Sequence, residues 1–274
     1  MAAARQVARP AQRTCDLNWG NVVRKVLALR WRPGRDTALA LATALVMVGS
    51  YYINAQARNA TWTLVVFVGL TNGLLNVLLP AWYVLRVRRE RPEALGLTGR
   101  WWWLAGLISL GIAAANWPRL LAQAALRPDV DLAAHVLTNG AVFWEPFFVH
   151  GWLQLRFERA FGVIPGIVLA AVCFAAYHLG TYPLPVVLNF GLAVLALGAL
   201  FRVTGNLLTV WPLTWAVTSA IGTLRNPNLS FDGSALAVRA ALLAVQLAVI
   251  GWLIWSQRRP PVAAGSGHSA PAAV

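Results

Sequence analysis

The sequence predicts an all-α protein, a polytopic integral membrane helix bundle with about eight transmembrane helices. Of its 274 residues, 58% are hydrophobic and only 12% are charged, whereas a soluble domain has about 25% charged residues. Its apolar runs approach the roughly 20 residues that a spanning helix needs. The runs lack the alternation of apolar and polar residues that membrane β-strands show, so a β-barrel is disfavoured.

The candidate spans follow one another along the chain with short connections. We expect them at about residues 37–55, 62–85, 101–117, 132–153, 162–180, 183–201, 206–222 and 234–256. Glycine and proline interrupt several of these runs, and the pair around 183–222 is the hardest to delimit.

The spans divide the chain into three regions. Residues 1–36 form a basic N-terminal tail, 37–256 form the transmembrane domain, and 257–274 have the Pro, Ala, Gly and Ser composition of a disordered tail. Within the first region, residues 17–32 place apolar side chains at helical spacing around basic ones. This pattern predicts an amphipathic helix at the membrane surface, and a tail loosely bound to lipid is the alternative.

The distribution of positive charge predicts the topology, because Lys and Arg concentrate on the cytoplasmic side of membrane proteins. They are frequent in both tails and in the loops around 86–100 and 156–159, and the intervening loops hold few. Both termini are therefore expected in the cytoplasm, with membrane lipid as a partner of the basic loops. The net charge of +14 does not indicate nucleic-acid binding, because no soluble domain remains to carry a basic face.

Ionisable side chains inside a span indicate function by default, because burying a charge in a membrane is costly. The expected spans contain His135, Glu145, His150, His178 and Arg239. Arg239 is near the outer end of the last span, so we expect its long side chain to reach the interface. His135 is near the outer start of its span, which favours an interfacial or internally hydrogen-bonded histidine.

Glu145 and His178 are predicted to lie at similar depth in the membrane. Glu145 precedes the turn at 160–162 by about 16 residues and His178 follows it by about 17, and antiparallel helices rise equally per residue. A carboxylate that faces a histidine and a water molecule can act as a general base. The alternative is a hydrogen bond that only holds two helices together.

Pro146 and His150 flank this glutamate. Pro146 donates no backbone N–H, so we expect it to free the Val142 carbonyl, kink the helix and open space beside Glu145. His150 is about 140° around the helix from Glu145 and faces elsewhere.

No cofactor is indicated with certainty, and a divalent metal has weak support. Glu145 and His178 would supply two ligands, whereas catalytic zinc usually has three protein ligands. The remaining candidates, His135 and His150, are unfavourably placed.

Three segments, in order, resemble the CPBP family of intramembrane proteins, which includes CAAX proteases, bacteriocin-processing proteins and type II CAAX prenyl endopeptidases. The family's EExxxR motif is similar to residues 145–152, EPFFVHGW, and its FxxxH motif is met by Phe174 to His178. The third motif, a Thr-Gly turn before a helix bearing HxxxN, is similar to residues 204–219. The resemblance covers the CPBP-like core at residues 135–222.

The resemblance implies a glutamate-dependent peptidase in which Glu145 activates water and His178 is its partner. The family's second glutamate is Pro146 in this chain and its arginine is His150. Both members of that pair are changed together, so no buried charge is left without its partner.

The third motif departs from the family as well, because its His and Asn are Trp215 and Ser219. Trp215 has an indole N–H and Ser219 a hydroxyl, so both are possible oxyanion-hole replacements, since such a site needs donors rather than particular residues. Loss of one donor costs about 10²–10³ in rate. Loss of both would leave a folded but nearly inert protein.

These observations leave two functions open. The first is an intramembrane endopeptidase that hydrolyses a membrane-associated peptide or protein with water activated by Glu145 and His178. The second is a catalytically degenerate family member acting as a membrane scaffold, a chaperone or a bacteriocin-immunity-type protein. A transporter or channel is a further class, but no matched pair of broken repeats indicates one. The family's breadth and the Ala, Arg and Val content favour a bacterial cell membrane.

Overall fold

The structure, a computed structural model, describes residues 26–57, 62, 65–226, 229 and 231–257. Over these residues the chain forms helices and connecting loops without a β-strand, which confirms the predicted all-α bundle. Most of the expected amphipathic helix and nearly all of the expected disordered tail lie outside the described residues.

The elements continue one another or follow after short connections. In chain order they are α2 (Arg35–Gln56), the π-helix η1 (Val65–Leu78), α4 (Leu79–Trp82), the π-helix η2 (Tyr83–Val87), the 3₁₀ turn η3 (Pro92–Leu95), α5 (Trp102–Ala125), α6 (Leu132–Gly140), α7 (Trp144–Pro146), the π-helix η4 (Phe147–Gln154), α8 (Leu155–Phe161), α9 (Val163–Tyr177), α10 (Leu184–Thr204), the 3₁₀ turn η5 (Leu207–Thr209), α11 (Leu213–Leu224) and α12 (Gly233–Gln257).

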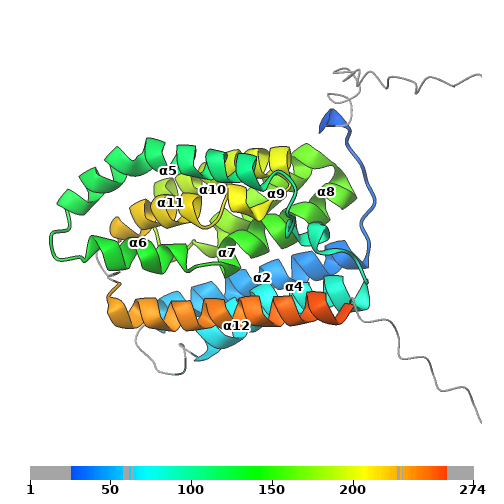
Figure 1. Cartoon of the computed structure of the whole chain (residues 1–274), viewed down its shortest axis with the longest axis horizontal. Coiled ribbons are helices and arrows are strands. Elements are labelled where there is room, and N and C mark those ends of the chain that lie inside the picture. The colour runs from blue at the N-terminus through cyan, green and yellow to red at the C-terminus, as the bar shows by residue number, and fades with distance from the viewer. Residues whose placement is uncertain (1–25, 58–61, 63–64, 227–228, 230, 258–274) are drawn as a thin grey trace, which may run out of the picture.

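Figure 1 shows the long helices side by side in one bundle. The start of α2 and the end of α12 lie at the same end, named here the proximal end. The loop from α5 to α6 and the connection from α11 to α12 lie at the opposite, distal end. Within the described ranges, five helices are long and apolar enough to cross a membrane: α2, Val66–Val87, α5, α10 and α12. Since α9 and α11 are shorter apolar helices, the chain is a membrane helix bundle with spans of unequal length.

The fourth expected span, 132–153, is two helices rather than one. α6 and α7 are separated by the non-helical residues 141–143. The predicted kink at Pro146 is therefore wrong, because the break precedes the proline. Pro146 lies in the first turn of the new helix, where a backbone N–H has no intrahelical partner to lose. Glu145 is thereby held at the start of a helix, beside the break in the chain.

A non-helical segment, residues 28–34, closes the proximal end of α8. The backbone N–H groups of Arg30 and Arg32 donate to the last two carbonyls of α8 at 3.0 and 2.8 Å. Such terminal carbonyls have no partner within their own helix, so the segment satisfies them. Of the amphipathic helix expected over 17–32, the described part is helical only up to residue 27.

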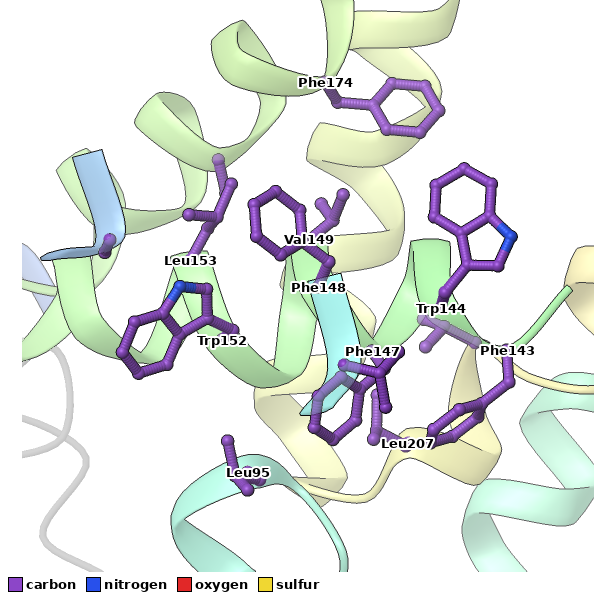
Figure 2. Close-up of a cluster of buried hydrophobic side chains, with 14 of the residues drawn as sticks. Leu95, Phe143, Trp144, Phe147, Phe148, Val149, Trp152, Leu153, Phe174 and Leu207 are labelled. Atoms are coloured by element: carbon purple, nitrogen blue, oxygen red, sulfur yellow. The ribbon is translucent and has the colours of Figure 1, made fainter. Parts of the chain in front are cut away.

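The helix that carries Glu145 runs through the centre of the bundle. Every residue of η4 is buried, including the polar pair His150 and Gln154, as expected of a helix inside the core. Figure 2 shows its side chains leaving the helix toward different neighbours: Phe147, Phe148, Val149, Trp152 and Leu153. Packing on all sides of η4 fixes the position of the residues just before it.

Arg156 of α8, which the charge pattern had assigned to a basic loop, is buried at the proximal end. Its guanidinium lies 3.5 Å from Asp36 Oδ2 and 3.4 Å from Glu90 Oε2, and it donates to the Ala94 carbonyl at 2.7 Å. It also lies 5.4 Å from the centroid of the Trp152 ring. One buried cation therefore joins α2, the connection after η2 and α8.

Replacing Arg156 with alanine is expected to lower the free energy of unfolding by about 3 kcal/mol, because the change removes the one buried cation of this network and leaves Asp36 and Glu90 only the half-exposed Arg88 and Arg159. Unfolding of the purified protein in mixed micelles measures the loss. Arg159→Ala is the matched control: Arg159 also pairs with Glu90, at 2.7 Å, but is 49% exposed, and exposed pairs contribute about 0–1 kcal/mol. Equal losses for the two variants would contradict this role of Arg156.

Candidate active site

Glu145 and His178 meet inside the bundle, as the count of residues from the turn predicted. Glu145 is in the first turn of its helix, and His178 directly follows the last residue of α9. His178 Nε2 lies 3.8 Å from Glu145 Oε1, and both side chains are largely buried. The separation is too long for a direct hydrogen bond, so a water molecule beside both atoms can bridge them.

The hydrogen bonds of the two residues define what each presents to the other. His178 Nδ1 lies 2.9 Å from the Phe174 carbonyl. A carbonyl only accepts, so the neutral ring carries its proton on Nδ1 and presents the Nε2 lone pair toward Glu145. On the other side, the Tyr177 hydroxyl donates to Glu145 Oε1 at 2.6 Å. This bond fixes one carboxylate oxygen; among the described residues no donor reaches the second with full hydrogen-bond geometry, and the Trp215 side chain lies close to the carboxylate.

A cavity of about 70 Å³ adjoins the pair. This volume is several times the roughly 10–15 Å³ that one water molecule needs. Phe190, Ala193 and Val194 of α10 form one wall, and Trp215, Ser219 and Thr223 of α11 form the facing wall. α10 packs on α9, whereas α11 packs on α5 and α6. Because Ala193 is exposed, the cavity lies close to the side of the bundle.

Trp215 and Ser219 both line this cavity, but they offer different groups to it. Trp215 Nε1 is buried without a hydrogen-bond partner among the described residues. The Ser219 hydroxyl donates to Asn139 Oδ1 at 2.8 Å. Its single proton is used there, so Ser219 presents only lone pairs to a ligand. Trp215 is therefore the better placed donor of the two.

Tyr177 and Asn139 are site residues that the sequence reasoning missed. Asn139 Nδ2 donates to the His135 carbonyl at 2.8 Å and to Thr223 Oγ1 at 3.2 Å, which orients the amide that receives Ser219. Both residues offered a signal. Asn139 is an amide within an apolar run, and Tyr177 directly precedes the histidine of the FxxxH pattern.

The other two expected histidines lie away from the pair. His135 is fully buried, and its Nε2 lies 2.7 Å from Thr223 Oγ1, so it is an internally hydrogen-bonded histidine. His150 Nδ1 lies 2.8 Å from Gln154 Oε1, one turn along the same helix. Among the described residues, no group of three or more His, Cys, Asp or Glu side chains is arranged to hold a metal ion.

Comparison with known proteins adds one match. Residues 131–220 match the family model of Rce1-like type II CAAX prenyl endopeptidases. No curated protein and no solved structure matches the chain. The matched region begins at α6 and ends in α11, so it contains Glu145, His178, Trp215 and Ser219. Over residues 131–220, about a third of the chain, the protein is therefore similar to CAAX-protease-type membrane endopeptidases, in line with the resemblance to the CPBP family.

Proposed function

We propose that the protein is an intramembrane endopeptidase that hydrolyses a peptide bond of a membrane-associated substrate with water activated by Glu145 and His178. The observation that carries this proposal is the 3.8 Å approach of His178 Nε2 to Glu145 Oε1 beside a cavity large enough for water. A structural contact alone would need neither the space nor the free lone pair on Nε2.

The proposed reaction follows from the groups present. Water in the cavity donates one hydrogen bond to His178 Nε2 and gives its other proton to the free oxygen of Glu145 as it attacks the carbonyl carbon. The carbonyl oxygen becomes an oxyanion, and the Trp215 N–H is the donor available to it. Protonated Glu145 then gives its proton to the departing amine, the C–N bond breaks, and the carboxylate is restored.

Tyr177 acts in this scheme as a positioning residue. Its hydrogen bond to Glu145 holds the carboxylate so that the second oxygen faces the water. Replacing Tyr177 with phenylalanine is expected to lower kcat by about 10–10² with little change in KM, because a hydrogen bond to a charged group contributes about 1.5–3 kcal/mol. Steady-state cleavage in proteoliposomes measures both constants. Tyr52→Phe, at an exposed tyrosine, is the control; a kcat for Tyr177→Phe equal to that of Tyr52→Phe would exclude this role.

The second candidate, a catalytically degenerate membrane scaffold, chaperone or immunity-type protein, is favoured by a different observation. Trp215 occupies a wall of the cavity, and the proton of Ser219 is already used. The remaining volume of about 70 Å³ holds water but not a peptide, so a substrate must displace α10 or side chains of its wall. A degenerate family member does not need to admit a peptide to this cavity, so it does not need this displacement.

One assay separates the two candidates. Purified protein in proteoliposomes is incubated with membrane-anchored peptides, and mass spectrometry detects the two products of each cleavage. Wild-type protein that cleaves at a defined bond supports the peptidase. Folded protein that leaves every peptide intact, and gains cleavage only when Trp215 and Ser219 are changed, supports the degenerate family member.

A further inference from the structure

A second cavity lies between η1 and α12, lined by residues other than those beside His178. Its volume is about 310 Å³. Phe67, Val68 and Leu242 give it a largely apolar wall, and Asn72 and Arg239 add polar groups. The peptidase proposed above uses none of these residues.

Arg239 is the cation of this cavity and lies within the membrane-spanning part of α12. It is roughly 9 Å along the helix axis from the first residue, Gly233. Its guanidinium carbon lies 4.6 Å from the centroid of the Phe231 ring. In the part of the chain that the structure describes, no carboxylate oxygen lies within 4.0 Å of its nitrogens. Of the nine acidic residues, only Asp16 is outside that part.

An intramembrane cation without an anion is costly, so intramembrane charges are normally paired. Glu145 is near enough to attract Arg239 electrostatically, but it forms no ion pair with it within 4.0 Å, and it lines the other cavity and accepts a hydrogen bond from Tyr177. The ring of Phe231 covers one face of the guanidinium, and the hydrogen-bond donors of a guanidinium lie at its edge. Arg239 is therefore presented as a planar donor to a ligand that enters the cavity.

Asn72 is the second, independent observation. It is 4% exposed, it lines the cavity, and its Oδ1 is buried without a hydrogen-bond partner among the residues that the structure describes. Because no hydrogen bond fixes which end of the amide faces the cavity, its NH₂ group is free to donate to a ligand. The neighbouring Gln246 donates to the Asn72 carbonyl at 3.0 Å, and its own Oε1 has no partner in the described residues. Buried amide oxygens without a hydrogen-bond partner indicate that a polar group is missing from the site.

We propose that this cavity binds the phosphate group of a membrane phospholipid, with Arg239 and Asn72 as its donors. Arginine matches the oxygens of phosphate with two parallel N–H groups. The surroundings fit the rest of a lipid, because apolar side chains on the same two helices are exposed at the surface of the bundle: Leu70, Leu74, Val238 and Val245. A phosphate held at Arg239 places acyl chains along this surface.

Thermal unfolding of the full-length protein, purified in a neutral detergent, tests the proposal. Short-chain phosphatidylglycerol is expected to raise Tm in a concentration-dependent way. The diacylglycerol of the same chain length, which lacks the phosphate, is expected to leave Tm unchanged. A rise with inorganic phosphate equal to that with the lipid would assign the site to free phosphate, and a larger rise with a peptide bearing a free carboxylate would assign it to peptide. Either result would overturn the lipid as ligand.

Variants of Arg239 make the test specific to this cavity. Arg239→Gln should weaken the apparent Kd for phosphatidylglycerol by about tenfold or more, because it removes the charge-assisted pair of hydrogen bonds. Arg239→Lys keeps the charge but loses the planar donor pair. Its apparent Kd should lie between those of the wild type and Arg239→Gln. Arg119→Gln, at an exposed arginine of α5, is the control and should bind as the wild type does.

Two results would contradict the proposal: unchanged affinity in both Arg239 variants, or an equal rise of Tm with diacylglycerol. The comparison of phosphatidylglycerol with diacylglycerol uses only wild-type protein, so it tests the proposal even where a variant does not fold. Since the readout is binding rather than cleavage, failure here leaves the proposed peptidase untouched.

Discussion

Replacing Glu145 with glutamine is expected to lower peptide cleavage by about 10²–10⁴, the usual contribution of a general base. Glutamine has nearly the same shape and keeps an oxygen that accepts from Tyr177, so the fold and the hydrogen bond at 2.6 Å are retained. What is lost is the ability to take a proton from water. The initial rate of cleavage in proteoliposomes, at equal amounts of folded protein, measures the effect.

Glu93→Gln is the matched control for this variant. Glu93 is exposed, in the 3₁₀ turn at the proximal end, so the same chemical change there should leave the rate unaltered. If Glu145→Gln cleaves as fast as Glu93→Gln, Glu145 is not the base and the proposed mechanism is wrong.

The double change Trp215→His with Ser219→Asn is expected to raise cleavage by about 10² or more, because each oxyanion donor contributes about 10²–10³. Imidazole is smaller than indole, so the cavity of about 70 Å³ also gains space for the substrate. Asparagine supplies an NH₂ group where the Ser219 proton is now used by Asn139. The rate of the double variant relative to wild type, with the same peptides, measures the gain.

Trp215→Phe tests the role of the indole N–H by itself. Phenylalanine keeps most of the ring that packs at 5.9 Å from Phe174 and removes only the donor and part of the volume. A fall of about 10² is expected if the indole N–H stabilises the oxyanion. A rate equal to that of wild type would show that Trp215 fills the cavity without taking part.

The approach of Glu145 to His178 could be predicted from the sequence because it depends on local arithmetic. Two helices joined by a tight turn at Gly162 bring residues at equal distances from that turn to equal depth. The FxxxH spacing and the acid in an apolar run pointed to the same two residues. The all-α class could also be predicted from the sequence, because its apolar runs approach the length of a spanning helix and lack the alternation of membrane β-strands.

The break before Glu145 could not be read from the sequence with the same security. A proline ends or kinks a helix when it lies in the interior, and it is well tolerated in the first turn. The Asn139-Gly140 dipeptide directly before residues 141–143 is a turn signal, but it does not show by itself whether the helix ends there or is kinked at Pro146. Packing of α6 and of η4 against different neighbours decides it.

The contacts between distant elements were also beyond the sequence. Arg156 is paired with Asp36 and Glu90, which lie far away along the chain, so counting charges by loop placed it at the surface. The use of the Ser219 proton by Asn139 depends on α6 lying against α11. In both cases the sequence shows the residue type, but it does not show which distant residue becomes its partner.

An experimental structure of the protein in a lipid nanodisc, at a resolution that places water molecules, tests the central claim most directly. The mechanism predicts an ordered water within about 3.2 Å of both His178 Nε2 and a carboxylate oxygen of Glu145, in the cavity faced by Trp215. A direct hydrogen bond between Glu145 and His178, with no water in that cavity, would contradict the claim and make the pair a contact that only joins two helices.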